Sequence, residues 1–340
     1  DAPNLLLSQP PRTSAASAHL KARVGPSQAR TRRSSVAAKR QRLDIDPPFA
    51  DRATVGGVVA ANAYGLLRCA AGPVADLITA ARMVTGAGEV VKTGAHVVKN
   101  AAGYSLSRLI AGSHGSLAII TEVTFRTNPR PPARLAGFAR ASDVDLAAVA
   151  ALGLQNDLPS LDYVAVIGDK TSDPAVVFGM SGTDGFVRSA SEAASGVLAR
   201  FGLEMKPDEA SCDDLAEQAR RTLHGCSTDA ALRVSVPPSR GAEAASALAR
   251  ASDRWVWLVP SGIVAAGIVG DQHQCRTRLA GAAAQAIEQG GRGLWLRQPP
   301  GTRFRRIIGP SSPIEDRLVR SAKAAFDPAD ILSPGRIEGD

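Results

Sequence analysis

The chain has 340 residues, of which 44% are hydrophobic, 21% charged and 4% aromatic. This composition is typical of a globular protein, and the length is enough for two domains. The longest apolar runs are too short to span a bilayer, and four dispersed cysteines do not make a disulfide scaffold, so we expect a cytoplasmic protein without a transmembrane segment.

The net charge of +8 arises at the N-terminus. Residues 1–43 hold nine Lys or Arg and one acid, whereas residues 44–340 hold 31 bases and 31 acids. The first segment is rich in Ser, Ala and Arg and has no aromatic residue, which predicts a basic, disordered tail. Charge without a recognisable recognition module is weak evidence for nucleic acid, so we predict no specific nucleic-acid partner.

Three glycine-punctuated turns follow the tail, at 53–65, 98–104 and 112–122, and each lies next to an apolar run. Glycine permits positive φ and lets a ligand approach the main chain. Free backbone N–H groups in such turns form concavities that bind anions. The three turns together predict a large phosphate-bearing ligand held mostly by backbone, whereas any one alone would be explained by tight-turn geometry.

Regular elements are predicted between and after these turns. Alternating apolar residues indicate strands, apolar residues at helical spacing indicate a helix that ends at Gly112, and the prolines at 129–132 mark a domain boundary. The predicted elements are strand 76–84, strand 89–92, helix 104–111 and strand 119–126.

Helices and strands alternate from residue 133 to about residue 300. Ser142 is the predicted N-cap of the first helix in this region. The order helix–strand–strand–helix occurs twice, which predicts an antiparallel sheet with helices on one face. The predicted elements are helix 142–154, strands 163–167 and 175–180, helix 184–201, strand 231–236, helix 241–251, strands 255–260 and 263–269, helix 275–289, strand 293–297 and a last helix from 312.

The three turns, with the lead-in at 46–52 and the segment at 325–336, resemble the FAD-binding domain of vanillyl-alcohol-oxidase type (PCMH-type) flavoproteins. Within that group the chain is most similar to FAD-binding subunits of bacterial glycolate oxidases. The resemblance implies an α+β protein: a partial PCMH-type FAD-binding domain plus an antiparallel-sheet cap domain with helices on one face. It divides the chain into the tail 1–43, the second half of the FAD domain at 44–131, the cap at 132–300, and a segment at 301–340 that returns to the FAD domain.

The resemblance also assigns residues to the cofactor FAD. Backbone from the first turn would approach the pyrophosphate or ribitol, the second and third turns would flank the cofactor, and the following strand would lie along its adenosine. The implied cofactor-binding residues are Thr54, Val55, Gly56, Gly57, Ala60, Gly65, Gly103, Tyr104, Ser113, Gly115, Ile119, Ile120 and Thr121.

The sequence departs from the resembled family ahead of the first turn. The family begins with a subdomain whose glycine-rich turn holds the pyrophosphate, whereas residues 1–43 contain a single glycine, Gly25. We therefore expect this N-terminal FAD subdomain to be missing or replaced. Within the turns, His114 stands where the family usually has an acid, and Ala118 where it has glycine.

The implied reaction is oxidation of a small 2-hydroxy acid, with flavin accepting the hydride. A larger FAD subunit and an iron–sulfur subunit are the implied partners, and association with the inner membrane would be peripheral, through them. The alternative is a non-catalytic interaction or structural remnant that has lost flavin. Neither the catalytic base nor a metal site is predicted; the histidines considered as bases are His96, His114, His224 and His273, and the arginines considered for a substrate carboxylate are Arg297, Arg303, Arg305 and Arg306.

Overall fold

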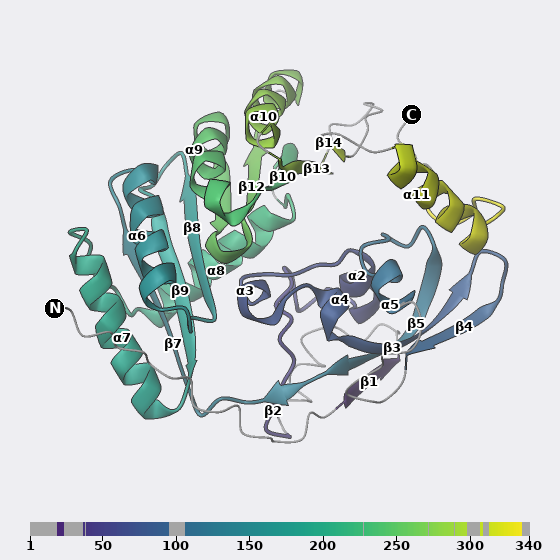
Figure 1. The fold of residues 1–340 in the computed structure, drawn as a ribbon, viewed down its shortest axis with the longest axis horizontal. Coiled ribbons are helices and arrows are strands. Elements are labelled where there is room, and N and C mark those ends of the chain that lie inside the picture. The colour runs from purple at the N-terminus through teal and green to yellow at the C-terminus, as the bar shows by residue number, and fades with distance from the viewer. Residues whose placement is uncertain are drawn as a thin grey trace.

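The computed structural model describes residues 19–23, 37, 39–94, 106–226, 228–270, 272–288, 290–297, 307–308 and 313–334. Within this part of the chain, two domains lie side by side (Figure 1). We name the domain that contains residues 54–126 the first domain, and the domain that contains residues 133–308 the second domain.

In the first domain, the predicted hairpin, helix and strand of residues 76–126 are confirmed in the described residues, except that Asp76 and Leu77 belong to a short helix and not to the first strand. Its elements are β1 (His19–Arg23), α2 (Val55–Ala60), α3 (Arg68–Ala71), α4 (Val74–Leu77), β3 (Ile78–Thr85), β4 (Val90–Gly94), α5 (Leu106–Ile110) and β5 (Ala118–Arg126). The sheet has the order β1-β5-β3-β4. Short helices cover one face, against which Met83, Val123 and Phe125 are almost fully buried. The other face is half exposed.

Strand β1 lies within the segment that the sequence predicts to be a disordered tail. It pairs antiparallel with β5, from His19 opposite Arg126 to Arg23 opposite Glu122. This pairing satisfies the backbone groups along one edge of β5, an interaction that composition does not reveal. Residues 19–23 therefore differ from the prediction. A second short pair, β2 (Gln41–Arg42) with β6 (Asn128–Pro129), links the start of the first domain to the domain boundary.

The second domain is built from two units with the same order of elements. The first unit is β7 (Ala133–Arg140), α6 (Val144–Asp157), β8 (Tyr163–Asp169), β9 (Ala175–Gly182) and α7 (Asp184–Ala199). The second is β10 (Ala230–Ser235), α9 (Gly241–Ala251), β11 (Arg254–Leu258), β12 (Ile263–Ile268) and α10 (Gln272–Ile287).

These two units form one eight-stranded antiparallel sheet with β13 (Arg292–Arg297) and β14 (Ile307–Ile308), in the order β14-β13-β10-β12-β11-β8-β9-β7. In each unit the first strand pairs with the third and the third with the second, and the units meet where β8 pairs with β11. The duplicated pattern read from the sequence is therefore confirmed.

One helix of the second domain was not predicted. Helices α6, α7, α9 and α10 cover one face of the sheet, whereas α8 (Glu209–Leu223) covers the other. Cys212, Leu215 and Ala219 recur at helical spacing on α8 and are buried against the sheet together with Tyr64 and Leu66 of the first domain. Helices therefore lie on both faces, and α8 faces α3 in Figure 1.

Helix α6 begins one residue later than predicted. Asp143, and not Ser142, is the N-cap: its carboxylate accepts the Leu146 N–H at 2.8 Å, and the Ser142 hydroxyl donates to the same carboxylate at 2.9 Å. A charged acceptor makes the stronger hydrogen bond to the helix N-terminus, which explains the shift.

Asp46 lies at the interface between the two domains, which we call the domain seam. Its Oδ1 accepts the Gly65 N–H at 3.1 Å, its Oδ2 accepts the Leu67 N–H at 3.3 Å, and Arg220 Nη1 of α8 lies 3.7 Å from Oδ2. A Cβ at Gly65, one of the predicted cofactor residues, would lie 2.4 Å from Asp46 O and 2.7 Å from Arg220 Cγ. Close packing at the seam therefore accounts for glycine at this position.

The C-terminal helix α11 (Pro313–Phe326) ends on the first domain. Gly86 N donates to Phe326 O at 2.8 Å, and Lys323 Nζ donates to Ser116 O at 3.0 Å. Lys323 also pairs with the buried Asp327 at 2.6 Å and with Asp330 at 2.8 Å. These contacts fix the chain after α11 against the turn that contains Ser116.

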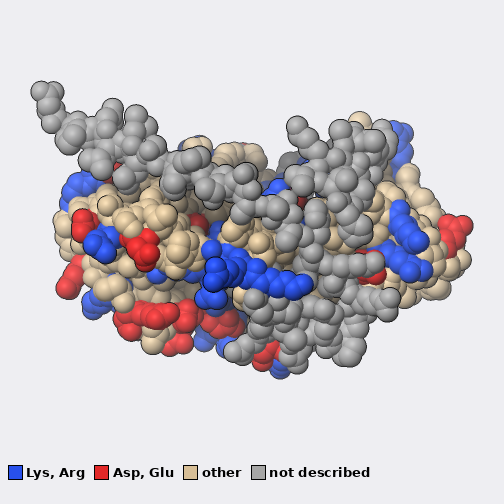
Figure 2. Space-filling model, turned by 90° about the horizontal axis from the view of Figure 1, so that it is seen from below, with Lys and Arg blue, Asp and Glu red and all other residues tan. Residues whose placement is uncertain are grey.

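The described surface carries charges of both signs. On the face shown in Figure 2, acidic and basic side chains are interspersed, with Lys and Arg gathered near the middle. This agrees with the equal numbers of acids and bases from residue 44 onward. Among the described helices, none combines the length and the hydropathy that crossing a membrane requires.

Candidate functional site

The first glycine turn begins helix α2. Thr54 is its N-cap, with φ −80° and ψ 151°, and Thr54 Oγ1 accepts the Gly57 N–H at 3.1 Å. Val55 and Gly56 are buried, whereas Gly57 is exposed. Gly57 therefore presents bare backbone at the open side of this turn.

The first and third glycine turns are in direct contact. Gly112 N donates to Val59 O at 3.1 Å, and His114 N donates to Ala60 O at 2.8 Å. Both turns thus belong to one backbone surface, although they are far apart in the sequence. This is the arrangement that binding of one ligand by both turns requires.

The third turn also meets the C-terminal loop. Gly112, His114 and Gly115 have φ of 89°, 53° and 74°, so the two glycines serve a left-handed backbone. Ser333 Oγ donates to His114 O at 3.5 Å. Ser113 is buried, and its hydroxyl donates to Ile110 O at 2.8 Å. This side chain therefore stabilises the turn, and a ligand would contact the backbone of the turn instead.

The predicted adenosine-side residues lie along β5. Ile119 is 57% exposed, whereas Ile120 is buried in the core of the first domain. The Thr121 hydroxyl donates to Arg82 O of the neighbouring strand at 3.0 Å. Ile119 therefore presents its side chain to the surface, whereas the half-buried Thr121 is bonded within the sheet. Gly103 and Tyr104 of the second turn lie outside the described residues, as does His96.

Asn62 lies where the first and third turns meet. Its backbone has φ 46°, and its Cβ is 3.5 Å from the position that a Cβ at Gly112 would occupy. Within the described residues, its Oδ1 is buried and has no hydrogen-bond partner. An unpaired buried amide oxygen costs on the order of 1–3 kcal/mol, so the contacts of the described residues leave this acceptor unsatisfied.

Two arginines from different domains lie against the ring of Tyr64. Arg68 Cζ of α3 is 4.3 Å from the ring centroid, and Arg233 Cζ of β10 is 5.4 Å from it. Tyr64 is only 4% exposed, and both arginines are half-buried. Sequence reasoning missed this group because Tyr64 and Arg233 come together only through the packing of the two domains.

His224 packs edge-on against the same ring, with ring centroids 5.4 Å apart. Its Nε2 lies 2.8 Å from Tyr64 O and 3.2 Å from Tyr64 N, so the tautomer decides whether it donates or accepts. Burial lowers the pKa of His224 to about 4. The positive charge of Arg233 also lowers this pKa, whereas the hydrogen bond to the Tyr64 backbone raises it. His224 is therefore neutral at pH 7, with Nε2 engaged by backbone.

The cysteines near the seam are not activated thiols. Burial raises the pKa of Cys69 to about 12 and the pKa of Cys212 to about 11, so both stay protonated at pH 7. Within the described part of the chain, no group of three or more His, Cys, Asp or Glu side chains is arranged to hold a metal ion.

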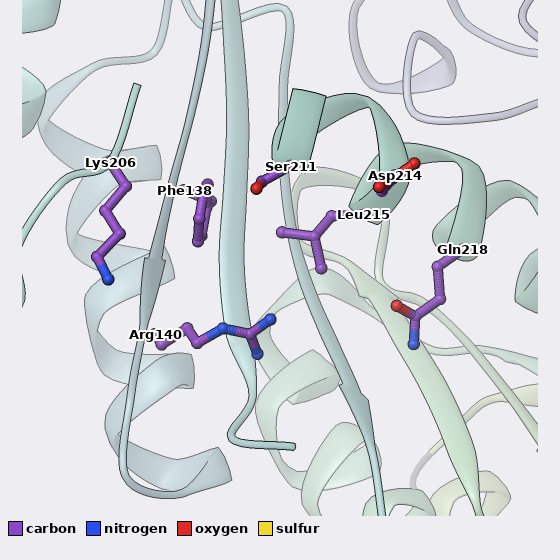
Figure 3. A pocket seen from close by; sticks show the side chains of 7 residues that line it. All are labelled: Phe138, Arg140, Lys206, Ser211, Asp214, Leu215 and Gln218. Carbon is purple, nitrogen blue, oxygen red and sulfur yellow. The ribbon is translucent and has the colours of Figure 1, made fainter. Parts of the chain in front are cut away.

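A pocket of about 340 Å³ lies between β7 and the N-terminal part of α8 (Figure 3). Phe138 and Leu215 form its apolar floor, and its other lining residues are Arg140, Lys206, Ser211, Asp214 and Gln218. Arg140 donates to Asp173 O at 2.7 Å, and Gln218 donates to Asp169 at 3.2 Å. This pocket contains none of the predicted cofactor residues, and much of its polar rim is already paired within the domain.

The FAD-binding-domain family matches residues 20–94, which include β1, the first glycine turn and the hairpin of β3 and β4. The chain contains an FAD-binding domain of the PCMH type. FAD is the cofactor of this domain. The match begins at residue 20, well before the boundary expected at residue 44, in agreement with the position of β1 in the sheet.

Curated relatives are similar to part of the chain. The chain is 44% identical over 96 residues to glycolate oxidase subunit GlcE of Escherichia coli (strain K12), and 44% identical over 95 residues to D-lactate dehydrogenase of Anaerostipes hadrus. These alignments cover 28% of this chain in both cases, and 27% and 20% of the relatives. The chain thus matches about a quarter of the length of these proteins.

Solved structures extend the similarity to both domains. Alkyldihydroxyacetonephosphate synthase aligns over 93% of this chain and 64% of its own, with a TM-score of 0.62 and 16% identity. Substrate-bound p-cresol methylhydroxylase aligns over 94% of this chain and 76% of its own, with a TM-score of 0.67 and 14% identity. The fold of both domains is therefore similar to part of the fold of these two proteins.

The described residues of the FAD-binding domain fit one side of a flavin. Gly57 offers exposed backbone, the turn at 112–115 offers left-handed backbone, and Asn62 offers an unpaired buried acceptor between them. A cofactor with phosphates and ring N–H donors matches this set of groups.

Proposed function

We propose that this chain is the FAD-binding subunit of an oxidoreductase that resembles glycolate oxidase and oxidises a small 2-hydroxy acid by hydride transfer to flavin. The observation that carries the proposal is the joining of the first and third turns by the Gly112 and His114 N–H groups. The chain is also 44% identical over 96 residues to glycolate oxidase subunit GlcE, which supports the assignment.

The chain's own residues would have separate roles in binding the cofactor and in the reaction. Backbone at Gly57 and at 112–115, with the amide of Asn62, would hold and orient the cofactor. When bound, FAD accepts a hydride from the activated C–H of the substrate. Among the histidines considered as bases, His224 is not available, because its Nε2 is bonded to the backbone of Tyr64.

We also propose that the chain works with further subunits. Relatives are named as glycolate oxidase subunits GlcE and GlcD, the latter from Bacillus subtilis (strain 168) and 33% identical over 103 residues. A larger FAD subunit and an iron–sulfur subunit are the proposed partners, in the cytoplasm and peripheral to the inner membrane. Co-purification with such subunits after affinity capture of the chain tests this proposal.

The flavin is tested by the visible absorbance of the purified chain before and after FAD is added. Under anaerobic conditions, glycolate or D-lactate should bleach the bands of oxidised flavin in the FAD-loaded protein. A chain that folds but binds no FAD would contradict the proposal and favour a non-catalytic remnant. A chain that binds FAD without being bleached by any 2-hydroxy acid would retain the cofactor and remove the substrate assignment.

Gly57→Val tests the residue assignment. The new Cβ would lie 3.0 Å from Thr54 Oγ1, and the side chain would cover the exposed backbone at the start of α2, so FAD affinity should fall at least a hundredfold while the second domain stays folded. Gly196→Val is the matched control, because Gly196 is an exposed helix glycine with no atom within 4 Å of a new Cβ. Equal flavin content in the two variants would refute the placement of the cofactor at Gly57.

A further inference from the structure

Arg68 and Arg233 lie against the ring of Tyr64 at the domain seam, and no acidic side chain balances their positive charge in the described part of the chain. In the described part of the chain, neither Arg68 nor Arg233 makes an ion pair or a hydrogen bond, and Arg68 Nη1 is a buried donor with no acceptor. Half-buried guanidinium groups normally bind a carboxylate or a phosphate, since their desolvation is otherwise uncompensated.

The acids near the seam are already committed to other cations. Asp46 accepts two backbone N–H groups and lies beside Arg220, and Glu217 pairs with Arg220 and Arg221 at 3.0 and 2.9 Å. The ring of Tyr64 offers both arginines only a cation–π contact. Such a contact is worth on the order of 0.5–2 kcal/mol and donates no lone pair to the N–H groups.

The neighbouring histidine adds no charge to this cluster at neutral pH. His224 is held neutral by burial, and its Nε2 is satisfied by the backbone of Tyr64. The group thus presents two fixed cations, a neutral imidazole and an aromatic ring. Both arginines remain partly exposed, so a small solute can reach them.

The position of the cluster links it to the cofactor turns. Tyr64 follows Asn62 by two residues, and Asn62 contacts the third turn at Gly112. Arg233 comes from the opposite domain, on a central strand of its sheet. The cations therefore lie where the FAD-binding domain meets the second domain.

We infer that Arg68 and Arg233, on the ring of Tyr64, form a carboxylate-binding site for a small organic acid at the domain seam. This inference rests on the proposed function, because the acid it selects would be the substrate. A guanidinium group pairs with the two carboxylate oxygens through parallel N–H bonds, and the apolar ring excludes water beside them. Because one arginine comes from each domain, acid binding also requires the two domains to be packed together.

Calorimetric titration of the full chain, with and without FAD, tests the site without relying on turnover. The probes are glycolate, D-lactate and the neutral analogue glycolamide. Wild-type protein should bind glycolate at least tenfold more tightly than glycolamide. This comparison needs no variant, so it holds even if a substitution prevents folding. Equal affinity for the acid and the amide, or no binding of either acid, overturns the proposal.

Arg68→Gln and Arg233→Gln should each lower glycolate affinity at least tenfold without changing affinity for glycolamide or FAD. Arg68→Lys and Arg233→Lys should recover part of the loss, since they keep the charge but not the fork of donors. Arg188→Gln, at an exposed arginine of α7, is the matched control and should behave as wild type.

The variants also separate two sources of the anion. If the glutamine variants lose affinity for FAD and keep affinity for glycolate, the arginines bind the cofactor phosphates and the proposal is overturned. If acid binding follows the expected pattern but the flavin is never bleached, the carboxylate site stands and the proposed oxidation does not.

Discussion

Strand β12 of the second domain is buried at all six of its residues, whereas β5 of the FAD-binding domain includes half-buried and exposed residues, with Ile119 57% exposed. The difference follows from what covers each sheet. Four helices pack on one face of the second domain, and α8 with Tyr64 and Leu66 packs on the other. In the described part of the FAD-binding domain the helices lie on one face, so we expect its stability to depend more on turns, caps and the C-terminal segment.

The largest expected effect on stability is in the doubly covered sheet. Trp257→Ala removes a fully buried indole from the centre of β11, so the free energy of unfolding should fall by roughly 3–5 kcal/mol. Ile119→Ala is the matched strand variant on the open face and should cost less than about 1 kcal/mol. Denaturant unfolding monitored by circular dichroism measures both. Similar losses would show that the two sheets are not covered differently.

The domain seam should be sensitive to acid. The pKa of His224 is about 4 in the folded protein, below its ordinary value of 6.5, so the unfolded chain binds the proton more tightly. Above pH 6.5 His224 is neutral in both states, and its contribution to the free energy of unfolding is complete. As the pH falls from 6.5 to 4, the free energy of unfolding decreases by on the order of 3 kcal/mol.

Urea unfolding at pH 7, 5.5 and 4.5 checks the acid sensitivity. His224→Asn should flatten this part of the profile, although other groups still titrate below it. A variant whose stability falls with pH as steeply as that of wild type would show that His224 is not the group responsible.

The smallest expected effect is at the cap of the cofactor turn. Thr54→Ala removes the side-chain acceptor of the Gly57 N–H, so the free energy of unfolding should fall by about 1 kcal/mol. Thr54→Ser keeps the hydroxyl and should retain most of the stability. If the two variants are equally destabilised, the loss comes from the methyl group and the cap does not support the turn.

The sequence alone revealed much of the fold through local patterns. Alternation in residues 76–84 and 119–126, helical spacing near Leu106, and the repeated order of elements after residue 133 all correspond to observed elements. Glycines at 112 and 115 were recognisable because only a left-handed turn or a close approach favours them there. The resemblance to PCMH-type flavoproteins rested on the three glycine turns, of which the family match covers the first, at residues 53–65.

Other features were visible in the sequence but not recognised. Asp208 followed by Cys212, Leu215 and Ala219 is a capped amphipathic pattern that predicts α8, and Asp143 is as good an N-cap as Ser142. The pairing of β1 with β5 was not recognisable in this way. An edge strand uses backbone groups that every residue carries, so a basic, aromatic-free composition neither predicts nor excludes it.

What only the tertiary structure decided is the meeting of distant residues. The sequence determined the turns, because positive φ and close approach are local demands on residue type. It could not determine that Arg233 would come to the ring of Tyr64, that Asp46 would close the seam against Gly65, or that Asn62 would keep an unpaired acceptor beside Gly112. Those contacts depend on how two separately covered sheets pack together, and no local pattern of residues encodes that packing.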